Sequence, residues 1–258
     1  MQLSQAAALV AKLEFVESTG STNDDLVRHA ASPDWPDLSV LAAAEQTAGK
    51  GRAGRVWESR PEASLSVSIL VRPNHVDLGH YGWLPILAGL AMTEAVAEFL
   101  PDREVGFKWP NDVLVGERKI SGVLSELTGD GSAVVIGAGL NLTQTQAELP
   151  IENATSLALQ DATVSFEAAL ETYLANFVKH YRAWLNAKGD ADLSGLRREA
   201  TLRCSSIGRR VRAIMPGDNV VEGKAIEIDE QGRLLIAVDA EARLYAVAAG
   251  DIVHLRHN

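Results

Sequence analysis

Residues that could bind an anion are concentrated in one stretch of the chain, from Gln46 to Trp57. It carries three glycines and three cations, in the order Gly49, Lys50, Gly51, Arg52, Gly54 and Arg55. Glycine permits a positive φ or a close approach of the backbone to a ligand, and Lys and Arg supply positive charge to it. The stretch is therefore predicted to be a phosphate-binding loop.

Two known phosphate-binding patterns fit this loop poorly. The spacing Gly49-x-Gly51-x-x-Gly54 matches the dinucleotide fingerprint, but that motif opens a helix and is followed by an acidic residue about 20 positions later. Here Arg55 and Pro61 follow in place of a helical apolar pattern. The Gly-x-x-x-x-Gly-Lys-Ser/Thr pattern is absent. A solvated basic turn remains the alternative when the loop is considered alone.

Composition limits the classes of partner. The chain has 258 residues, 47% of them hydrophobic, which suits one large domain or a large domain with a small one. No apolar run approaches the ~20 residues of a transmembrane helix, and no secretory signal is apparent, so a cytoplasmic protein without a membrane partner is expected. The net charge of −10 opposes broad nucleic-acid binding. A basic loop in an acidic protein favours one small anion.

Nucleophilic and zinc chemistry find little support. Cys204 is the single cysteine and has no flanking Cys or His, so a small buried residue is expected there. The six histidines are scattered without ligand spacing and form no Ser-His-Asp pattern.

The elements around the loop can be placed from periodicity. A helix is expected from Gln2 to Leu13, and a buried strand from Leu38 to Ala44 leads into the loop. A strand over Leu65–Val71 alternates apolar residues with serines, which predicts one apolar and one polar face. Ser21 and Thr22 precede a helical segment, where they either cap the helix or reach a polar ligand.

A second polar cluster follows in the middle of the chain. Residues Val105–Val115 and Arg118–Glu126 are predicted to be two strands joined by a tight turn. Pro110 interrupts the first of them, which leaves Asn111 and Asp112 to direct polar groups toward the site end of the sheet.

The remaining elements divide the chain in two. Amphipathic helices are predicted over Tyr81–Leu100 and Phe166–Leu185, the latter with an aromatic stripe typical of a core. A strand from Ala133 to Ile136 runs into Gly137-Ala138-Gly139-Leu140-Asn141. From about Ser206 five short strands predict a small β-barrel. The domain boundary is placed between residues 205 and 206.

Taken together, these residues resemble the biotin protein ligase family over essentially the whole chain. The resemblance is carried by Ser21-Thr22-Asn23, the basic loop ending in Trp57, Lys108-Trp109-Pro110-Asn111-Asp112, Arg118-Lys119 with Gly122, Gly137-x-Gly139-x-Asn141, Ala154-Thr155-Ser156-Leu157 and Ala249-Gly250-Asp251. It implies an α+β fold in residues 1–205, with a mixed, mostly antiparallel sheet flanked by helices as in class II synthetases. Residues 206–258 would form an SH3-like barrel.

The resemblance also implies a two-step reaction. The carboxylate of biotin attacks the α-phosphate of ATP to give biotinyl-5′-AMP and pyrophosphate, and a lysine of a biotin carboxyl carrier protein domain then takes the biotinyl group. Preorganised cations would offset the repulsion between carboxylate and triphosphate, and Mg²⁺ would share that task. A monomer or weak homodimer is expected.

Site roles follow from the resemblance. Lys119 would contact the biotin carboxyl and the α-phosphate, and with Arg52 and Asp112 it forms the expected catalytic set. Asp112 could instead hold Mg²⁺ or receive the incoming lysine. The full set expected to bind biotin or ATP is Ser21, Thr22, Asn23, Gln46, Gly49, Lys50, Gly51, Arg52, Arg55, Trp57, Lys108, Asn111, Lys119, Gly122, Gly137, Gly139 and Asn141.

Two positions depart from the family pattern, because the family often has arginine where Lys50 stands and a basic residue where Ala53 stands. Lysine keeps the charge and loses the bidentate fork. The loop over residues 49–55 is expected to act as a mobile lid.

Three alternatives stay open. A lipoate-type protein ligase would share the fold and the adenylation chemistry, but the glycine-rich loop and the barrel favour biotin. A biotin-responsive transcriptional repressor would need a DNA-reading module, and the segment before Phe15 is too short for one. A non-catalytic biotin-binding protein would not need Lys119 and the basic loop.

Overall fold

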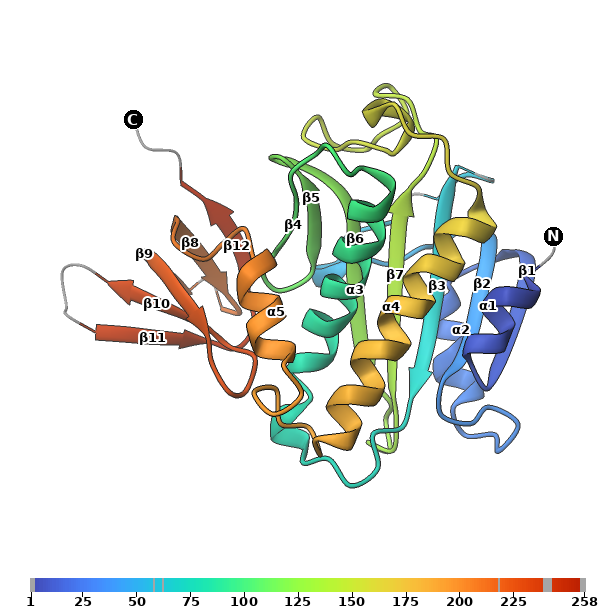
Figure 1. Cartoon of the computed structure of the whole chain (residues 1–258), viewed down its shortest axis with the longest axis horizontal. Coiled ribbons are helices and arrows are strands. Elements are labelled where there is room, and N and C mark those ends of the chain that lie inside the picture. Colours follow the sequence, from blue (N-terminus) through green and yellow to red (C-terminus); the bar gives the residue numbers. More distant parts are fainter. Residues whose placement is uncertain (1–2, 58, 62, 218, 239–242, 256–258) are drawn as a thin grey trace.

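The protein is built on a seven-stranded sheet. Figure 1, a computed structural model, shows its strands side by side from β1 at one edge to β4 at the other. The structure describes residues 3–57, 59–61, 63–217, 219–238 and 243–255. The strand order is β1-β2-β3-β7-β6-β5-β4, with β1 parallel to β2 and every other pair antiparallel. The strands are β1 (Lys12–Thr19), β2 (Ser39–Gln46), β3 (Ser64–Val71), β4 (Val105–Lys108), β5 (Asp112–Val115), β6 (Arg118–Leu127) and β7 (Val134–Asn141). The predicted mixed, mostly antiparallel sheet is confirmed.

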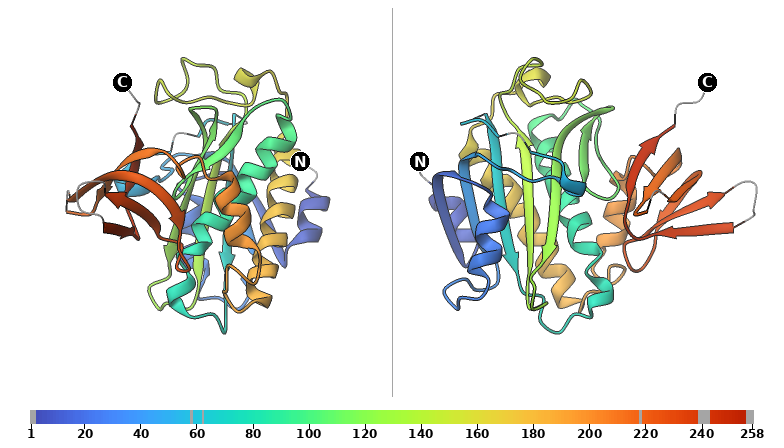
Figure 2. Two further views of the ribbon diagram at one scale, coloured as in Figure 1. Left: turned by 60° about the vertical axis from the view of Figure 1, so that its left-hand side comes forward. Right: turned by 180° about the vertical axis from the view of Figure 1, so that it is seen from behind.

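Helices cover the two faces of this sheet unequally. On one face lie α3 (Trp83–Phe99) and α4 (Phe166–Asn186), flanked by α1 (Ser4–Leu9) and α5 (Leu196–Arg203). Among the described α-helices only α2 (Thr22–His29) lies on the other face, beside the segment that joins β2 to β3 and crosses over β7 and β6 (Figure 2, right). The second face is therefore the one left open for a ligand. None of the described helices combines the length and apolar character needed to cross a membrane.

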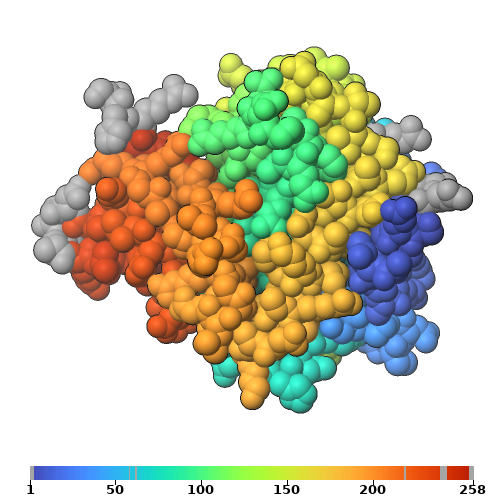
Figure 3. Space-filling model, in the orientation of Figure 1, coloured from blue at the N-terminus to red at the C-terminus, as the bar shows by residue number. Residues whose placement is uncertain are grey.

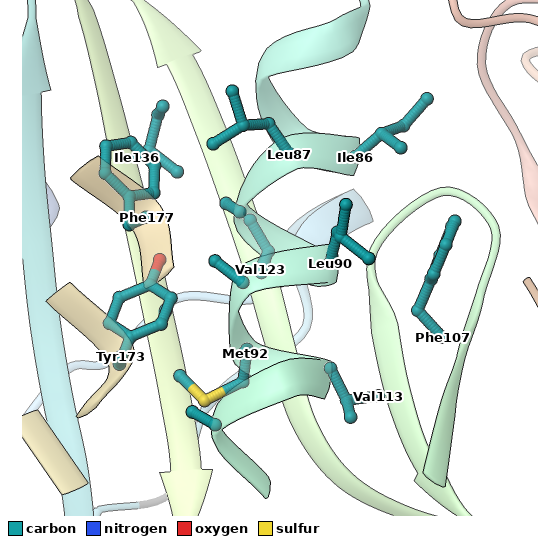
Figure 4. Close-up of a cluster of buried hydrophobic side chains, with 14 of the residues drawn as sticks. Ile86, Leu87, Leu90, Met92, Phe107, Val113, Val123, Ile136, Tyr173 and Phe177 are labelled. Atoms are coloured by element: carbon teal, nitrogen blue, oxygen red, sulfur yellow. The ribbon is translucent and has the colours of Figure 1, made fainter. Parts of the chain in front are cut away.

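The main hydrophobic core fills the space between α3, α4 and the sheet. Figure 4 shows Leu87 of α3 on the side of Ile136 of the sheet and Phe177 of α4, and Leu90 of α3 on the side of Phe107. All five side chains are almost completely buried. Burial of large apolar side chains stabilises the fold by about 1.5–3 kcal/mol each. This face is thus the rigid support on which the open face is built.

The C-terminal residues form a second, five-stranded antiparallel sheet in the order β11-β10-β9-β8-β12. Its strands are β8 (Arg210–Met215), β9 (Asn219–Ile228), β10 (Leu234–Val238), β11 (Arg243–Val247) and β12 (Asp251–His254). Within the described ranges no pairing joins β11 to β12, so closure as a barrel is not established. Figure 3 shows this part packed directly against the helices of the larger sheet. The boundary at residue 205 stays a prediction, and residues 256–258 of the predicted domain lie outside the described residues.

The N-terminal helix is shorter than expected. It spans Ser4–Leu9, and Lys12 and Leu13 already belong to β1, while Gln2 lies outside the described residues. The prediction to Leu13 was wrong because the parallel pairing of β1 with β2, a contact distant in sequence, decides the conformation there.

The strand expected across Val105–Val115 is two strands. The chain reverses after Lys108, where Asn111 N–H donates to Lys108 O at 3.1 Å, and β5 returns antiparallel to β4. Pro110 therefore sits in a turn between strands, and Asn111 and Asp112 lie at its exit. Their predicted position at one end of the sheet is confirmed.

The amphipathic pattern of one helix was misjudged, and the two-faced pattern of strand β3 was confirmed. Helix α3 is buried on nearly all sides, because the sheet, α4 and α5 all pack against it. On β3 the polar face, with Ser64, Ser66 and Ser68, is as buried as the apolar one. Those serines lie under α2 and the crossing loop, so they form a polar wall inside the protein. The aromatic stripe of α4 and Cys204 are buried as predicted.

A mostly buried carboxylate ties the helical layer together. Glu94 of α3 hydrogen-bonds to His180 Nε2 at 2.8 Å, and Lys179 and Arg203 lie 3.7 and 3.9 Å away. Burial alone would raise the pKa of Glu94, but the hydrogen bond to His180 and the nearby positive charges hold it below its ordinary value. A carboxyl whose pKa is lowered by folding stabilises the protein above its unfolded pKa.

Glu94→Gln should therefore lower the free energy of unfolding by about 1–3 kcal/mol at pH 7. The difference from the wild type should shrink as the pH falls from about 5 toward the lowered pKa, because the folded state then loses the charged carboxyl. Urea unfolding at several pH values measures both effects. Glu98→Gln, on the exposed side of the same helix, is the control. A pH-independent difference would contradict this role.

Candidate active site

A cavity of about 320 Å³ lies between the open face of the sheet and the loop that joins β2 to β3. Its walls come from segments far apart in sequence: α2, the loop, β5, β6, β7 and the segment around Ile151. Of the residues expected to bind ligand, the cavity is lined by Ser21, Thr22, Asn23, Gln46, Lys50, Gly51, Arg52, Arg55, Trp57, Asn111, Asp112, Lys119, Gly122, Gly137, Gly139 and Asn141. Gly49 and Lys108 are the two that do not line it.

One end of the cavity is a neutral hydrogen-bonding wall. Gln46 Oε1 accepts from both the backbone N–H and the hydroxyl of Thr22, at 2.8 and 3.0 Å. Because these two bonds occupy that oxygen, the amide nitrogen of Gln46 remains as a donor. Thr22 Oγ1 lies 2.7 Å from Ser68 Oγ, whose single proton is shared between Thr22 Oγ1 and Asn23 Oδ1, and Thr22 Oγ1 keeps a lone pair. The wall thus offers a donor beside an acceptor.

Asn23 fixes the back of this wall. Its amide nitrogen donates to Glu126 Oε2 at 2.7 Å, and its oxygen accepts from Ser68 Oγ at 2.6 Å. A Cβ on Gly137 would come within 2.2 Å of that oxygen, so only glycine leaves room for the amide. Ser21 caps α2 by accepting from Asp24 N–H at 3.5 Å, which confirms the capping interpretation of this segment. Cap and cavity wall are therefore the same short segment.

Trp57 covers the middle of the cavity and lies on sheet surface that has no side chains. A Cβ on Gly139 would come within 2.2 Å of the indole ring, and one on Gly122 within 3.6 Å. The indole Nε1 is buried and has no acceptor among the described residues. An unmet buried donor costs about 1–3 kcal/mol, and a ligand carrying an acceptor would satisfy it.

A β-bulge sets the direction of Lys119. Leu114 pairs with Lys119 and Val113 with Ser121, so Ile120 is the extra residue in β6. The bulge places Lys119 and Gly122 on the same face, although residues three apart in a regular strand point to opposite faces. The ammonium consequently points into the cavity, where Lys119 Nζ lies 2.7 Å from Asp112 Oδ1.

The backbone of Lys119 is held on its other side as well. Its N–H donates to Asn153 O at 2.9 Å, and Thr155 N–H donates to its carbonyl at 2.8 Å. Asn141 Nδ2 in turn donates to Thr155 O at 2.8 Å. This gives the Ala154-Thr155-Ser156-Leu157 motif a structural task, which is to anchor the strand that carries Lys119.

The loop arginines gather near Lys119. Arg52 donates to Asn111 Oδ1 at 2.7 Å and to Gly250 O at 3.0 Å. Arg55 donates to both carboxylate oxygens of Asp251, at 2.8 and 3.0 Å. Burial lowers the pKa of Arg52, yet a guanidinium stays charged at neutral pH. The second sheet therefore reaches the cavity through the start of β12.

A wider cleft of about 840 Å³ opens beside this end, between the two sheets, and meets the cavity at Arg55, Asp112, Lys119 and Ile151. Lys108 lies there, and burial lowers its pKa. His254 Nε2 lies 3.0 Å from Ser206 Oγ, which accepts from Trp109 N–H at 3.2 Å. Burial lowers the pKa of His254 to about 4, so its ring is neutral at pH 7.

Lys50 has a partner that the sequence did not suggest. Its ammonium lies 2.5 Å from Asp24 Oδ1, at the Thr22 end of the cavity and away from Lys119. Gly49 lies behind the cavity, where a Cβ would come within 2.4 Å of Trp57 O. An anion contact by Lys50 stays a prediction.

Sequence reasoning missed several residues that line the cavity or support its walls. Asp24, Glu126 and Asp251 hold loop or wall residues in place, and Val67 and Ile151 add apolar surface. Only Asp251 lay inside a quoted motif, and its partner is 196 positions away, a separation that no local pattern reports.

Comparison with known proteins agrees with this geometry. Residues 15–141 match the family described as "Biotin/lipoate A/B protein ligase family", and residues 206–255 match "Biotin protein ligase C terminal domain". Fold and site thus define a ligase of the biotin and lipoate class.

Curated relatives narrow the class. The chain is 39% identical over 247 residues to a biotin–(acetyl-CoA-carboxylase) ligase of Mycobacterium tuberculosis, covering 95% of this chain and 90% of the relative. It is 32% identical over 233 residues to the bifunctional ligase/repressor BirA of Escherichia coli, covering 89% and 70%. A biotin protein ligase from Aquifex aeolicus in complex with biotin and ATP aligns with a TM-score of 0.78 and 25% identity, covering 96% and 100%. The chain belongs to the biotin protein ligase family.

Gly139→Ala should push Trp57 off the sheet and weaken binding of biotin by about tenfold or more, because the new methyl group would occupy ring space. Isothermal titration measures the affinity, and circular dichroism checks the fold. Gly129→Ala is the matched control, since a Cβ there meets nothing within 4 Å. Unchanged affinity in the Gly139 variant would contradict the placement of Trp57.

Proposed function

We propose that this protein joins biotin to ATP, releasing pyrophosphate, and then transfers the biotinyl group from the adenylate to a lysine of a biotin carboxyl carrier protein domain. The observation that carries the proposal is the chemistry of the two ends of the cavity. A neutral wall stands at Thr22 and Gln46, and a cluster of cations stands at Arg52, Arg55 and Lys119. Biotin–(acetyl-CoA-carboxylase) ligase is also the name of the Mycobacterium tuberculosis relative.

The neutral wall suits a cyclic urea. Such a ring presents a carbonyl acceptor between two N–H donors, and the wall offers the amide nitrogen of Gln46 and the lone pair of Thr22 Oγ1. A site built to pair both kinds of group rejects analogues that lack them, because its buried polar groups would be left unpaired. A lipoyl ring has no urea, so this wall favours biotin.

The cationic end addresses a charge problem. A carboxylate that approaches a triphosphate is repelled, and further negative charge develops on the departing pyrophosphate. The ammonium of Lys119 is compact and can interact with the carboxylate oxygen and the α-phosphate as the bond forms. Arg52 and Arg55 would bind phosphate oxygens, exchanging their present partners Gly250 and Asp251 for the nucleotide.

A Mg²⁺ ion fits this end only if the protein and the nucleotide phosphates coordinate it together. Magnesium sites of this kind use one or two carboxylates together with substrate phosphates. Asp112 supplies one carboxylate beside the cations, and the part of the chain that the structure describes contains no cluster of three His, Cys, Asp or Glu side chains. Asp112 would hold the ion with the nucleotide, and the ion would add positive charge to the phosphates.

In the second step the amine of the carrier lysine attacks the acyl carbon of the adenylate. The new C–N bond replaces the bond from that carbon to the phosphate oxygen, AMP leaves, and the nitrogen gives up a proton. An ordinary lysine has a pKa near 10.4, so the ammonium must first lose a proton. Asp112 lies where the cavity and the cleft meet, in position to attract the ammonium of the carrier lysine. The loop keeps water from the labile anhydride.

Mass spectrometry of a biotin carboxyl carrier domain incubated with the protein, biotin and ATP tests the proposal. A mass increase of one biotinyl group on a single lysine is expected. Parallel reactions with lipoate in place of biotin should leave the carrier unmodified. Modification by lipoate and not by biotin would overturn the assignment.

Lys119→Ala should reduce pyrophosphate release by at least about a hundredfold, because the variant lacks the cation that meets both reacting groups. Its fold should persist, since the side chain lines a cavity and supports no core. A coupled pyrophosphate assay measures the loss, with Lys224→Ala, on the exposed side of β9, as control. Normal pyrophosphate release by the Lys119 variant would refute its role.

A further inference from the structure

The loop from Gly49 to Trp57 is held over the cavity by the hydrogen bonds of Arg52 to Asn111 and Gly250 and by ion pairs at two places. Near the neutral wall Lys50 pairs with Asp24 of α2, and near the cations Arg55 pairs with Asp251. Between them the chain turns at Ala53 and Gly54, both with positive φ (54° and 73°). The apolar side chain of Val56 is 70% exposed, although the residue lines the cavity. The ring of Trp57, packed against Gly139, holds the end of the loop on the sheet, and charged contacts hold the part that carries Lys50 and Arg55.

The two contacts differ in what a nucleotide would do to them. Arg55 faces the end where phosphates would bind, so its pairing with Asp251 competes with the ligand. Lys50 lies at the other end, beside Thr22 and Asn23, and its partner is on a helix packed against the sheet. The Lys50 contact can thus persist while the arginines exchange partners.

The surroundings of Lys50 favour this pairing. Asp24 lies in the first turn of α2 and does not line the cavity. The hydrogen bond that Lys50 Nζ donates to Asp24 raises the pKa of the ammonium, burial opposes the rise, and the charges of Asp24 and Glu126 add to it. The Glu126 carboxylate is already engaged by Asn23, so Asp24 is the direct partner.

We infer that Asp24 is a positioning residue that closes the loop over the ring end of the cavity through Lys50, and so sets how long biotin stays bound. The inference rests on the proposed function. Biotin would leave only when this contact opens, whereas the arginine end can open for the nucleotide. Asp24 would therefore act on dissociation more than on the chemistry at Lys119.

The expected size of the effect is modest. Lys50 and Asp24 side chains are 46% and 37% exposed, and exposed ion pairs contribute little to stability. Asp24→Asn should therefore speed biotin dissociation by about threefold to tenfold, since loss of one contact acts mainly on the dissociation rate. An exposed ion pair is also screened by salt.

Stopped-flow displacement of bound biotin from the full chain, between about 20 mM and about 0.5 M salt, tests the inference. Wild-type dissociation should quicken with salt, and dissociation from the Asp24→Asn variant should be fast and nearly independent of salt. Lys50→Met, which leaves α2 untouched, should reproduce this behaviour. The exchanged pair Asp24→Lys with Lys50→Asp should restore slow, salt-dependent dissociation. The rate of pyrophosphate release at saturating biotin should change less than the dissociation rate in every variant.

Glu222→Gln is the matched control, because Glu222 pairs with Arg212 at a similarly exposed site in the second sheet. It should leave dissociation unchanged. Dissociation from both Asp24→Asn and Lys50→Met that matches the wild type in rate and salt dependence overturns the role of Asp24. Failure of the wild type to bind biotin overturns the proposed function, and the inference with it.

Discussion

The site depends on the contact of the Trp57 indole ring with glycine backbone of the sheet. Trp57 can pack against the sheet because Gly139 of β7 has no side chain: a Cβ there would come within 2.2 Å of the indole ring, and Gly122 of β6 faces Gly139 across the ladder. Because Trp57 ends the cationic loop, its contact with the sheet also positions that loop, and the loop covers the cavity. The rigid helical layer behind the sheet keeps these two strands in register, so core packing and ligand geometry are linked through one pair of glycines.

The two ends of the cavity differ in charge. The end built from Thr22 and Gln46 presents amide and hydroxyl groups, with the carboxylate of Glu126 behind it on Asn23, while the other end collects two arginines and a lysine. In the described residues each of these cations already has an oxygen partner: Asn111, Asp251 and Asp112. The site is thus preorganised for anions without carrying unpaired charge, and a ligand enters by exchanging partners.

Local sequence predicted much of this arrangement. Glycines, the cationic loop and the polar clusters occur as short motifs, and the residues expected to bind ligand meet in one cavity, apart from Gly49 and Lys108. Local motifs could not predict contacts between segments that are far apart in the sequence. The pairing of β1 with β2 ended the first helix early, and the hairpin at Lys108 split an expected strand. The sequence assigned no role to Asp24 or Asp251, because only folding brings each to its loop partner.

The bulge at Ile120 shows how the fold and the chemistry compete at one position. Ile120 and Val123 both belong to the hydrophobic core, and Lys119 and Gly122 both face the cavity, which no regular strand of this length allows. If β5 and β6 paired without the bulge, the ladder would be regular, but the Lys119 ammonium would point toward apolar side chains. Regular strand pairing and an ammonium in the cavity are therefore mutually exclusive here, and any redesign of this sheet for greater regularity would turn Lys119 out of the cavity first.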